Sequence, residues 1–198
     1  MSHASIDTGV DRRAFVAGLL HSCPQALVIT GLGSSAYDVF AAGDRDENFY
    51  LWGAMGGAAG VGLGLALAQS RRSVLVITGD GEQLMGLGML ATIGAQQPDN
   101  LSIIVLDNGH FGETGMQRSH TSLGTDLAAV ARACSFRNVV EIGDMGQIEA
   151  LARTVNARGG CTLAKVQVRA DELPRALPPR DGVYVKNRLR AALGFAPF

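Results

Sequence analysis

Short apolar runs alternate along the chain with segments in which apolar residues recur at helical spacing. The runs are continuous and rich in Val, Ile and Leu, which is typical of strands buried on both faces. We predict strands over 26–30, 49–52, 73–81, 101–109, 137–142 and 161–169. We predict helices over 11–22, 34–43, 53–70, 82–97, 125–135 (with Thr125 as N-cap) and 145–157, and a further helix near the C-terminus. Residues 110–124 have no clear period and are expected to form a loop.

The strict alternation of strand and helix predicts an α/β fold. Buried strands with helical connections form a doubly wound, mainly parallel sheet with helices on both faces. With 198 residues, we expect a single domain over 1–198, in which 171–198 is a C-terminal extension. Ligands bind such sheets beyond the carboxyl ends of the strands. Three predicted strands end there in the glycine-rich sequences GLGSS, GDGE and DNGH, so we expect the site in these loops.

Composition narrows the possible partners. The formal net charge is −1, which gives no reason to expect nucleic acid or an anionic membrane surface. The first residues contain no apolar segment typical of a secretory signal. The chain has three widely spaced cysteines, which suit reduced thiols better than a disulfide framework or a zinc site. We therefore expect a cytoplasmic protein.

Glycine is the outlier, with 26 residues, about twice the usual ~7%. Eighteen of them lie between Gly31 and Gly124, where apolar runs meet turns. Residues 51–70 carry no charge and place Gly56, Gly60 and Gly64 four residues apart, a spacing also found in membrane helix dimers. Because the stretch sits within the α/β alternation, a helix packed closely against another backbone is the better interpretation. Such a helix also suits a subunit interface and self-association.

The sequence from Gly31 to Ala36 matches GxGxxA after a predicted strand, the start of a nicotinamide-binding motif. That motif also needs an acidic residue at the end of the next strand, to bind the ribose. The predicted strand 49–52 is followed by Gly53-Ala54-Met55 without an acid, so nicotinamide binding is only a weak alternative. A phosphate held by Ser34, Ser35 and free amides at a helix N-terminus fits the same residues.

Asp80 and Asn108 each follow a predicted strand, and 28 residues separate them (108 − 80). One strand–helix–strand unit of that length places both side chains at neighbouring strand ends. Carboxylate, amide and carbonyl oxygens are the ligands that Mg²⁺ prefers, together with phosphate oxygens and water. The pair therefore predicts a magnesium site that a phosphate completes.

The segment from Gly79 to Asn108 resembles the diphosphate-binding motif of thiamine diphosphate enzymes, which opens with GDG and closes with two amide residues. The first closing residue here is Asp107 instead of the usual Asn. The preceding WGAMGG also resembles this family, with Met55 at the position of the apolar residue that supports the bent cofactor. The resemblance implies thiamine diphosphate and Mg²⁺ as cofactors and the fold that binds them. It implies Mg²⁺ ligands in Asp80, Asn108 and the His110 carbonyl. The implied cofactor-binding residues are Gly31, Ser34, Ser35, Gly53, Met55, Gly79, Asp80, Gly81, Glu82, Asn108, His110, Phe111 and Gly112, with the Gly81 and Glu82 amides on the diphosphate.

The sequence from Asn108 to Gln117, NGHFGETGMQ, is similar to a phrase of the subgroup that contains sulfopyruvate decarboxylase β subunits and phosphonopyruvate decarboxylase. It departs from that phrase at Phe111, Gly112 and Met116. The resemblance implies decarboxylation of a small anionic 2-oxo acid such as sulfopyruvate or phosphonopyruvate. His110, Glu113 and His120 are then the candidates for proton transfer, with solvated loop residues as the plainer interpretation.

Thiamine enzymes also need a pyrimidine-binding domain, whose glutamate activates the cofactor. One α/β domain leaves no room in this chain for a second, so we expect a separate α subunit that carries the glutamate. Three alternatives stay open: half of an acetolactate synthase-like carboligase, a non-catalytic cofactor-binding scaffold, and the nicotinamide-binding domain.

Overall fold

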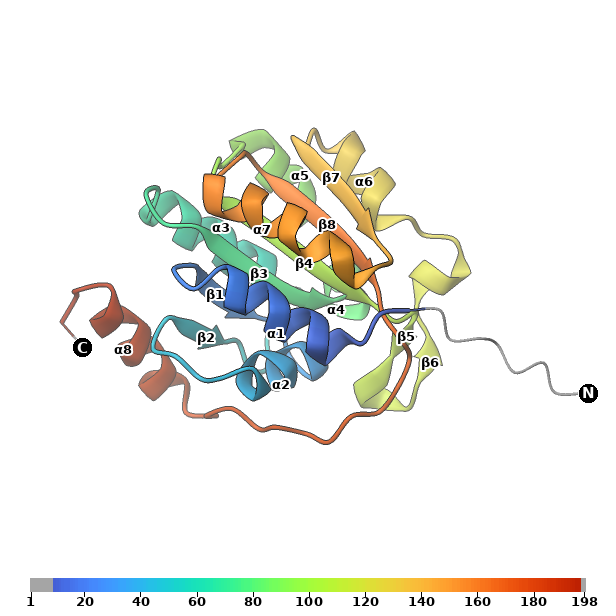
Figure 1. The fold of residues 1–198 in the computed structure, drawn as a ribbon, viewed down its shortest axis with the longest axis horizontal. Helices are drawn as coiled ribbons and strands as arrows, with labels where there is room; N and C mark the ends of the chain where they lie inside the picture. The colour runs from blue at the N-terminus through green and yellow to red at the C-terminus, as the bar shows by residue number, and fades with distance from the viewer. Residues whose placement is uncertain (1–8, 197–198) are drawn as a thin grey trace, which may run out of the picture.

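The computed structural model describes residues 9–196, and a six-stranded sheet runs through its centre (Figure 1). The strand order is β2-β1-β3-β4-β8-β7, and every neighbouring pair is parallel. The strands are β1 (Leu27–Thr30), β2 (Asn48–Tyr50), β3 (Val74–Gly79), β4 (Leu101–Asp107), β7 (Asn138–Ile142) and β8 (Thr162–Gln167). Residues of β1 and β4 are buried throughout, which explains their continuous apolar sequences. The predicted parallel sheet is confirmed.

Helices cover both faces of the sheet, so the doubly wound prediction is also confirmed. One face packs against α1 (Arg12–Ser22), α2 (Ser34–Ala41) and α7 (Ile148–Ala157). The other packs against α3 (Ala58–Ala68), α5 (Met89–Gln96) and α6 (Leu127–Ala133). Asp126, not the predicted Thr125, is the N-cap of α6, because its carboxylate accepts from the amides of Ala128 and Ala129.

Two predicted helices are wrong in extent, and one contact explains both. The predicted helix 53–70 begins only at α3, because Gly53 and Gly56 have φ angles of +73° and +85°, which a right-handed helix excludes. The predicted helix 82–97 is split into α4 (Asp80–Met85) and α5, with a break at Gly86–Gly88. A Cβ on Gly56 would lie 2.8 Å from the Gly86 nitrogen. The two backbones therefore touch where both helices were expected to be continuous.

The predicted loop 110–124 is more ordered than expected. It contains a short hairpin of β5 (His110–Phe111) and β6 (Gln117–Arg118), and 3-10 turns η1 (Gly112–Thr114) and η2 (His120–Leu123). The Ser119 amide donates to the Gly109 carbonyl at 2.8 Å, which ties the hairpin back to the end of β4. A hairpin of two-residue strands has no alternating pattern long enough to recognise in a sequence.

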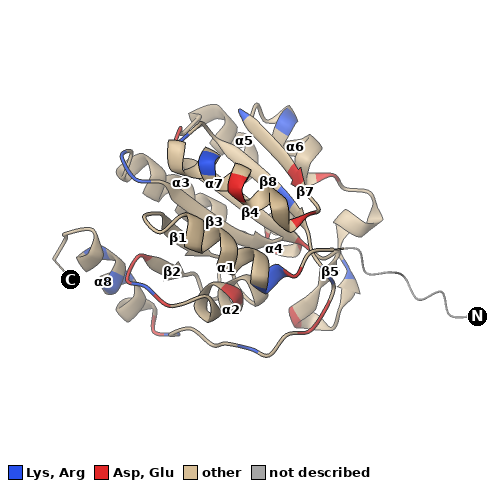
Figure 2. Ribbon diagram, in the orientation of Figure 1, with Lys and Arg blue, Asp and Glu red and all other residues tan. Residues whose placement is uncertain are grey.

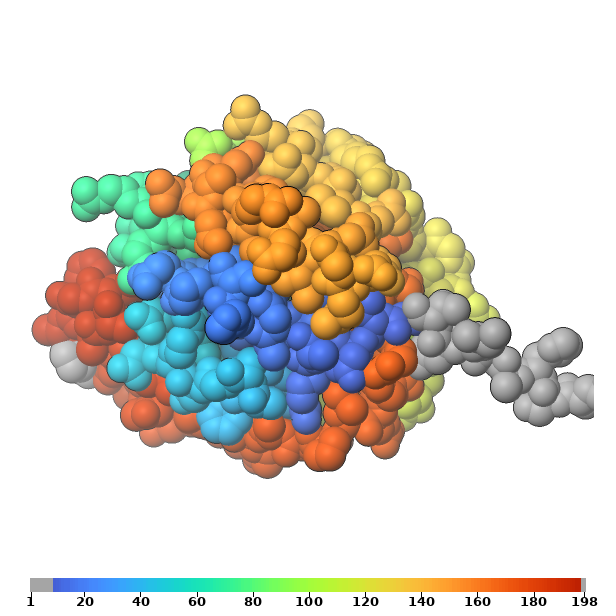
Figure 3. Space-filling view, in the orientation of Figure 1, coloured from blue at the N-terminus to red at the C-terminus, as the bar shows by residue number. Residues whose placement is uncertain are grey.

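After β8, residues 169–181 form a strap without helix or strand that leads to α8 (Gly182–Ala192). It crosses the outside of α2 as a band along one edge of the molecule (Figure 3). Arg13 Nη2 donates to the Pro174 carbonyl at 2.8 Å, and Trp52 Nε1 donates to Pro179 at 2.9 Å. The predicted extension 171–198 includes this strap from residue 171 onward and α8, although residues 197–198, like 1–8, lie outside the described range.

Charges of both signs are interspersed along the ribbon (Figure 2), in keeping with the net charge of −1. Within residues 9–196, none of the helices combines the length and apolarity needed to cross a bilayer.

Candidate cofactor and metal site

A cavity lies at the carboxyl ends of β3 and β4 and beside the N-terminus of α2, where the sequence predicted the site. Twelve of the fifteen predicted site residues line it: Ser34, Ser35, Met55, Gly79, Asp80, Gly81, Glu82, Asn108, His110, Phe111, Gly112 and Glu113. The remaining lining residues are Arg12, Leu32, Leu106, Thr114 and Val168. The topology thus brings together three loops that lie far apart in the sequence.

Asp80 is the first residue of α4 and is only 2% exposed. The Ser119 hydroxyl donates to its Oδ2, and Thr121 Oγ1 donates to the same oxygen at 3.1 Å. Thr121 Oγ1 also lies 2.8 Å from Asp107 Oδ1, so one hydroxyl touches both carboxylates. Burial raises the pKa of Asp80; the Ser119 hydrogen bond opposes this shift, and the charge of Asp107 adds to it. A cation beside Asp80 would offset that cost of burial.

Asn108 follows β4 and closes a tight turn. Its Oδ1 accepts from the His110 amide at 2.9 Å, and His110 Nδ1 lies 2.8 Å from the Asn108 carbonyl. The amide oxygen has a second lone pair, which a metal ion can use. Among the described residues, no three His, Cys, Asp or Glu side chains gather as a metal site. Any ion here would rely on mixed oxygen donors, which fits Mg²⁺ rather than zinc.

Gly81 and Glu82 follow Asp80 in the first turn of α4. A Cβ on Gly81 would lie 2.6 Å from Phe111 Cδ1, so glycine leaves room for the Phe111 ring beside α4. The Glu82 carboxylate accepts from Thr78 Oγ1 at 2.5 Å and from the Ala58 amide at 3.3 Å, at the start of α3. Burial raises the pKa of Glu82, and the Thr78 hydrogen bond counteracts it. This carboxylate therefore joins α4 to α3, and only its backbone amide is available to a ligand.

The predicted residue Gly31 does not line the cavity. A Cβ there would lie 1.4 Å from Glu82 Oε2, so Gly31 makes room for that buried carboxylate. Gly53 also lies outside the lining, in the same connection as Met55. Met55 does line the cavity and is 42% exposed, at the position where the resemblance places the cofactor support.

The N-terminus of α2 faces the cavity through Ser34 and Ser35. Gly33, its N-cap, has a φ of +81° and makes no side-chain cap, so the first amides of the helix need another partner. Ser35 is 3% exposed, and its hydroxyl has no hydrogen-bond partner among the described residues. A buried orphan hydroxyl beside a helix N-terminus suits an anionic group such as a diphosphate.

The three proton-transfer candidates do not all line the cavity. His110 and Glu113 line the cavity, and Glu113 forms an ion pair with Arg175 of the strap at 3.5 Å. His120 is exposed, does not line the cavity and packs edge-on against the Phe111 ring at 6.1 Å between centroids.

Sequence reasoning did not single out Ser119, Thr121 or Arg12. Ser119 and Thr121 lie in a segment without period, where the hydroxyl-rich SHTS gives only a weak signal. Arg12 precedes Phe15, Val16 and Leu19 at helical spacing, so a charge on the buried face of α1 could have been noticed.

Comparison with protein families matches residues 36–183 to the thiamine pyrophosphate enzyme, C-terminal TPP binding domain. The chain therefore belongs to the thiamine diphosphate-binding domains of this enzyme family, which confirms the resemblance. It is 40% identical over 192 residues to phosphonopyruvate decarboxylase of Streptomyces viridochromogenes, covering 94% of this chain and 47% of that protein. It is 45% identical over 118 residues to sulfopyruvate decarboxylase subunit beta of Methanothermobacter thermautotrophicus, covering 60% of this chain and 62% of the relative.

The chain spans about half or less of the length of the phosphonopyruvate decarboxylases that it matches. Among solved structures, benzoylformate decarboxylase from Polynucleobacter necessarius has the same fold, with a TM-score of 0.70 at 17% identity. That match covers 88% of this chain and 35% of the other.

Proposed function

We propose that the chain is the diphosphate- and Mg²⁺-binding part of a thiamine diphosphate-dependent decarboxylase of 2-oxo acids. The observation that carries the proposal is the buried Asp80 carboxylate, oriented by two hydroxyls in the cavity that Asn108 also lines. Family membership and the names of the relatives support it.

In this proposal Asp80, the Asn108 side chain and the His110 carbonyl hold Mg²⁺, and the amides of Gly81 and Glu82 contact the diphosphate. Ser119 and Thr121 fix the Asp80 carboxylate so that it meets the ion without rearrangement. Met55 supports the cofactor from the loop before α3. Bound thiamine diphosphate supplies the electron sink that makes loss of carbon dioxide from a 2-oxo acid possible.

We propose His110 and Glu113 as proton-transfer residues, because both line the cavity. His120 is a weaker candidate, because it packs outside the cavity lining against Phe111. We propose a small anionic 2-oxo acid such as phosphonopyruvate or sulfopyruvate as substrate, which the relatives' names support. An acetolactate synthase-like carboligase and a non-catalytic scaffold are the competing proposals.

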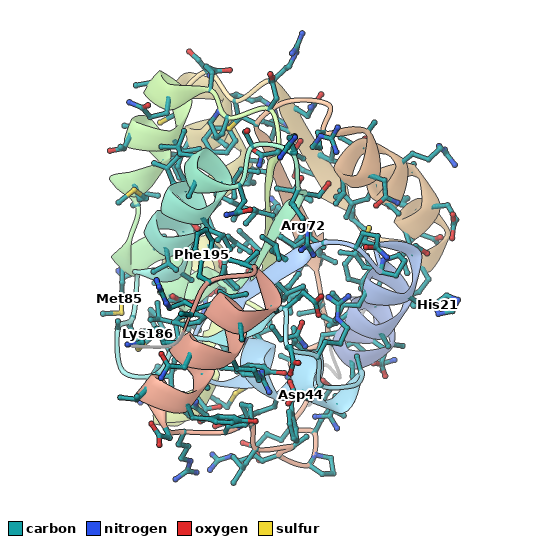
Figure 4. All side chains as sticks on the ribbon, turned by 90° about the vertical axis from the view of Figure 1, so that its left-hand side faces the viewer. His21, Asp44, Arg72, Met85, Lys186 and Phe195 are labelled. Carbon is teal, nitrogen blue, oxygen red and sulfur yellow. The ribbon has the colours of Figure 1, made fainter. Side chains whose placement is uncertain are left out.

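We further propose a separate pyrimidine-binding α subunit whose glutamate activates the cofactor. Relatives named subunit beta support a two-subunit enzyme. Met55 is 42% exposed at the cavity, and Met85, at the end of α4, is 63% exposed and points outward (Figure 4). The Gly56 backbone, next to Met55, touches the Met85–Gly86 backbone, and two exposed methionines there suit an interface with a partner chain or with a second copy. Three free thiols agree with a cytoplasmic location.

The proposal is tested by co-expressing the chain with a candidate pyrimidine-binding subunit from the same genome. The purified complex, given thiamine diphosphate and Mg²⁺, should release carbon dioxide and an aldehyde from phosphonopyruvate, sulfopyruvate or pyruvate. Condensed products instead of aldehyde would favour the carboligase. Cofactor binding without turnover of any 2-oxo acid would favour the scaffold.

A matched pair of variants tests the proton-transfer residues in the same complex. Glu113→Gln should reduce turnover by ~10²-fold or more, the usual contribution of a general acid or base. His120→Gln should have little effect, because that ring lies outside the cavity lining. Equal losses in the two variants would contradict this assignment.

A further inference from the structure

A buried arginine lies beside the cavity, although the sequence analysis gave it no role. Arg12, the first residue of α1, is 5% exposed and lines the cavity together with Ser34, Ser35 and Asn108. Its Nε donates to Asp38 Oδ2 at 2.7 Å, and its Nη1 donates to the Asp171 carbonyl of the strap at 3.0 Å. Within residues 9–196, its remaining nitrogen, Nη2, has no hydrogen-bond acceptor.

Arg12 is close to two carboxylates, because Asp171 Oδ1 lies 4.0 Å from its Nη1 in addition to the ion pair with Asp38. Asp38 is fully buried and is shared by two guanidinium groups, because Arg13 Nε also donates to it, at 3.0 Å. Burial raises the pKa of Asp38, whereas the charge of Arg12 lowers it, so the carboxylate depends on these cations. Arg12 is thus held rigidly by Asp38 and the strap while one edge of its guanidinium stays available to an anion.

Independent observations on α2 show unpaired donors that suit an anion at the same wall. The Ser35 hydroxyl is buried without a partner, and the first amides of α2 have no side-chain cap. A second cavity adjoins the first and shares Arg12, Ser34, Asn108, Gly112 and Glu113 with it, but Met55 does not line it. Its own lining adds the carboxylates Asp171 and Glu172 and the cation Arg175. Arg12 therefore lies toward the Asn108 part of the site and not toward Met55, which we propose supports the rest of the cofactor.

We infer that Arg12 binds the terminal phosphate of the cofactor's diphosphate, as a ligand in addition to the metal ion, and that it does so next to Ser35, which the sequence already predicted at the cofactor. This inference rests on the proposed function, because the phosphate belongs to thiamine diphosphate. A guanidinium presents paired donors that match phosphate oxygens, and the strap that holds Arg12 then also holds the phosphate site together. An anionic group on the substrate has similar chemistry, so the experiment below separates the two sources.

The first experiment titrates the full chain with inorganic pyrophosphate and Mg²⁺ by calorimetry. Arg12→Met should weaken pyrophosphate binding about 10- to 100-fold, the range expected for a lost charge-assisted hydrogen bond. Arg13→Met is the matched control, because Arg13 also pairs with Asp38 but lines neither cavity. Equal losses in the two variants would show that Arg12 acts only through Asp38, and absence of pyrophosphate binding by the unmodified chain would also overturn the inference.

Ser35→Ala keeps the test decisive if Arg12→Met does not fold. Removal of an unpartnered buried hydroxyl should leave the thermal midpoint unchanged or raise it. The same variant should weaken pyrophosphate binding about 2- to 10-fold. Unchanged affinity in Ser35→Ala would contradict the inference.

The second experiment uses the complex with its partner subunit and compares thiamine diphosphate with thiamine monophosphate. Arg12→Met should reduce the preference for the diphosphate while the KM of the 2-oxo acid stays unchanged. A raised KM with unchanged cofactor affinity would assign Arg12 to the substrate and overturn the inference. If the unmodified chain binds pyrophosphate but the complex does not bind thiamine diphosphate, the proposed function fails and the anion site stands.

Discussion

Alanine substitutions at two glycines of α3, two residues apart, test how this helix packs on the sheet. A Cβ on Gly62 would lie 2.3 Å from Val76 Cγ2, in the strand that leads to Asp80. A Cβ on Gly64 would meet nothing within 4 Å. Both positions are inside α3, so Gly62→Ala and Gly64→Ala change helix propensity equally and differ in packing alone.

The structure sets the size and sign of the difference in free energy of unfolding between the two variants. Ala is favoured over Gly in a helix interior by ~1 kcal/mol, so Gly64→Ala should raise the free energy of unfolding by about that amount. Carbon atoms pack at roughly 3.5–4.0 Å, so the new methyl of Gly62→Ala must push α3 or Val76 aside by more than ~1 Å. Overpacking of a core costs ~1–3 kcal/mol. The two variants should therefore differ by ~1–3 kcal/mol, because the propensity gain cancels.

Urea and thermal unfolding followed by circular dichroism measure this difference. For a chain of this length, ~1–3 kcal/mol corresponds to a gap of ~2–12 °C between the two thermal midpoints. Gly62→Ala should also weaken cofactor binding, because Val76 and Asp80 belong to consecutive elements. A Gly62→Ala variant as stable as Gly64→Ala would refute the packing of α3 on β3 described above.

Two further predictions concern buried thiols and the C-terminal helix. Burial raises the pKa of Cys161 to about 12 and that of Cys23 to about 11, whereas Cys134 is only half-buried. Iodoacetamide at pH 8 should therefore alkylate Cys134 first in the folded chain, and all three thiols equally in urea. Because the unfolded thiols lose their protons at lower pH than the buried ones, the free energy of unfolding should fall as the pH rises from ~9 to ~12. Labelling of Cys161 in the folded chain at the rate found in urea would contradict the burial of this thiol. Arg188 of α8 donates to Asp44 at 2.6 and 3.1 Å, so Arg188→Ala should lower the free energy of unfolding by ~1–3 kcal/mol in urea titrations. An unchanged midpoint would contradict this.

The sequence predicted the sheet well because buried parallel strands leave long apolar runs that require no knowledge of tertiary contacts. It also predicted that Asp80 and Asn108 share a cavity, since a strand–helix–strand unit places consecutive strand ends on one edge of the sheet. Helix bounds near glycine were less predictable. The contact between Gly56 and Gly86 ends one helix and breaks another, and such a long-range backbone contact leaves no periodic signal.

Side-chain partners were the least predictable part of the site. The sequence predicted a role for the Glu82 backbone amide at the diphosphate, but it did not reveal that the Glu82 carboxylate accepts from Thr78 and Ala58 and so links three elements. Ser119 and Thr121 reach Asp80 from about 40 residues away, through a hairpin too short to be recognised. Arg12 acts beside a site that begins about 20 residues later in the chain, so only the packing of α1 on α2 reveals it.

Two isosteric substitutions test the central claim, that Asp80 holds Mg²⁺ for the diphosphate. Asp80 and Asp107 contact the same Thr121 hydroxyl, yet only Asp80 is a proposed ligand. Calorimetry of thiamine diphosphate binding to the complex, with and without Mg²⁺, should show metal-dependent binding that Asp80→Asn reduces at least ~10-fold. Asp107→Asn should retain it, because an amide oxygen can still accept from the Gly109 amide. Binding that is independent of Mg²⁺, or is weakened equally by both substitutions, would contradict the account.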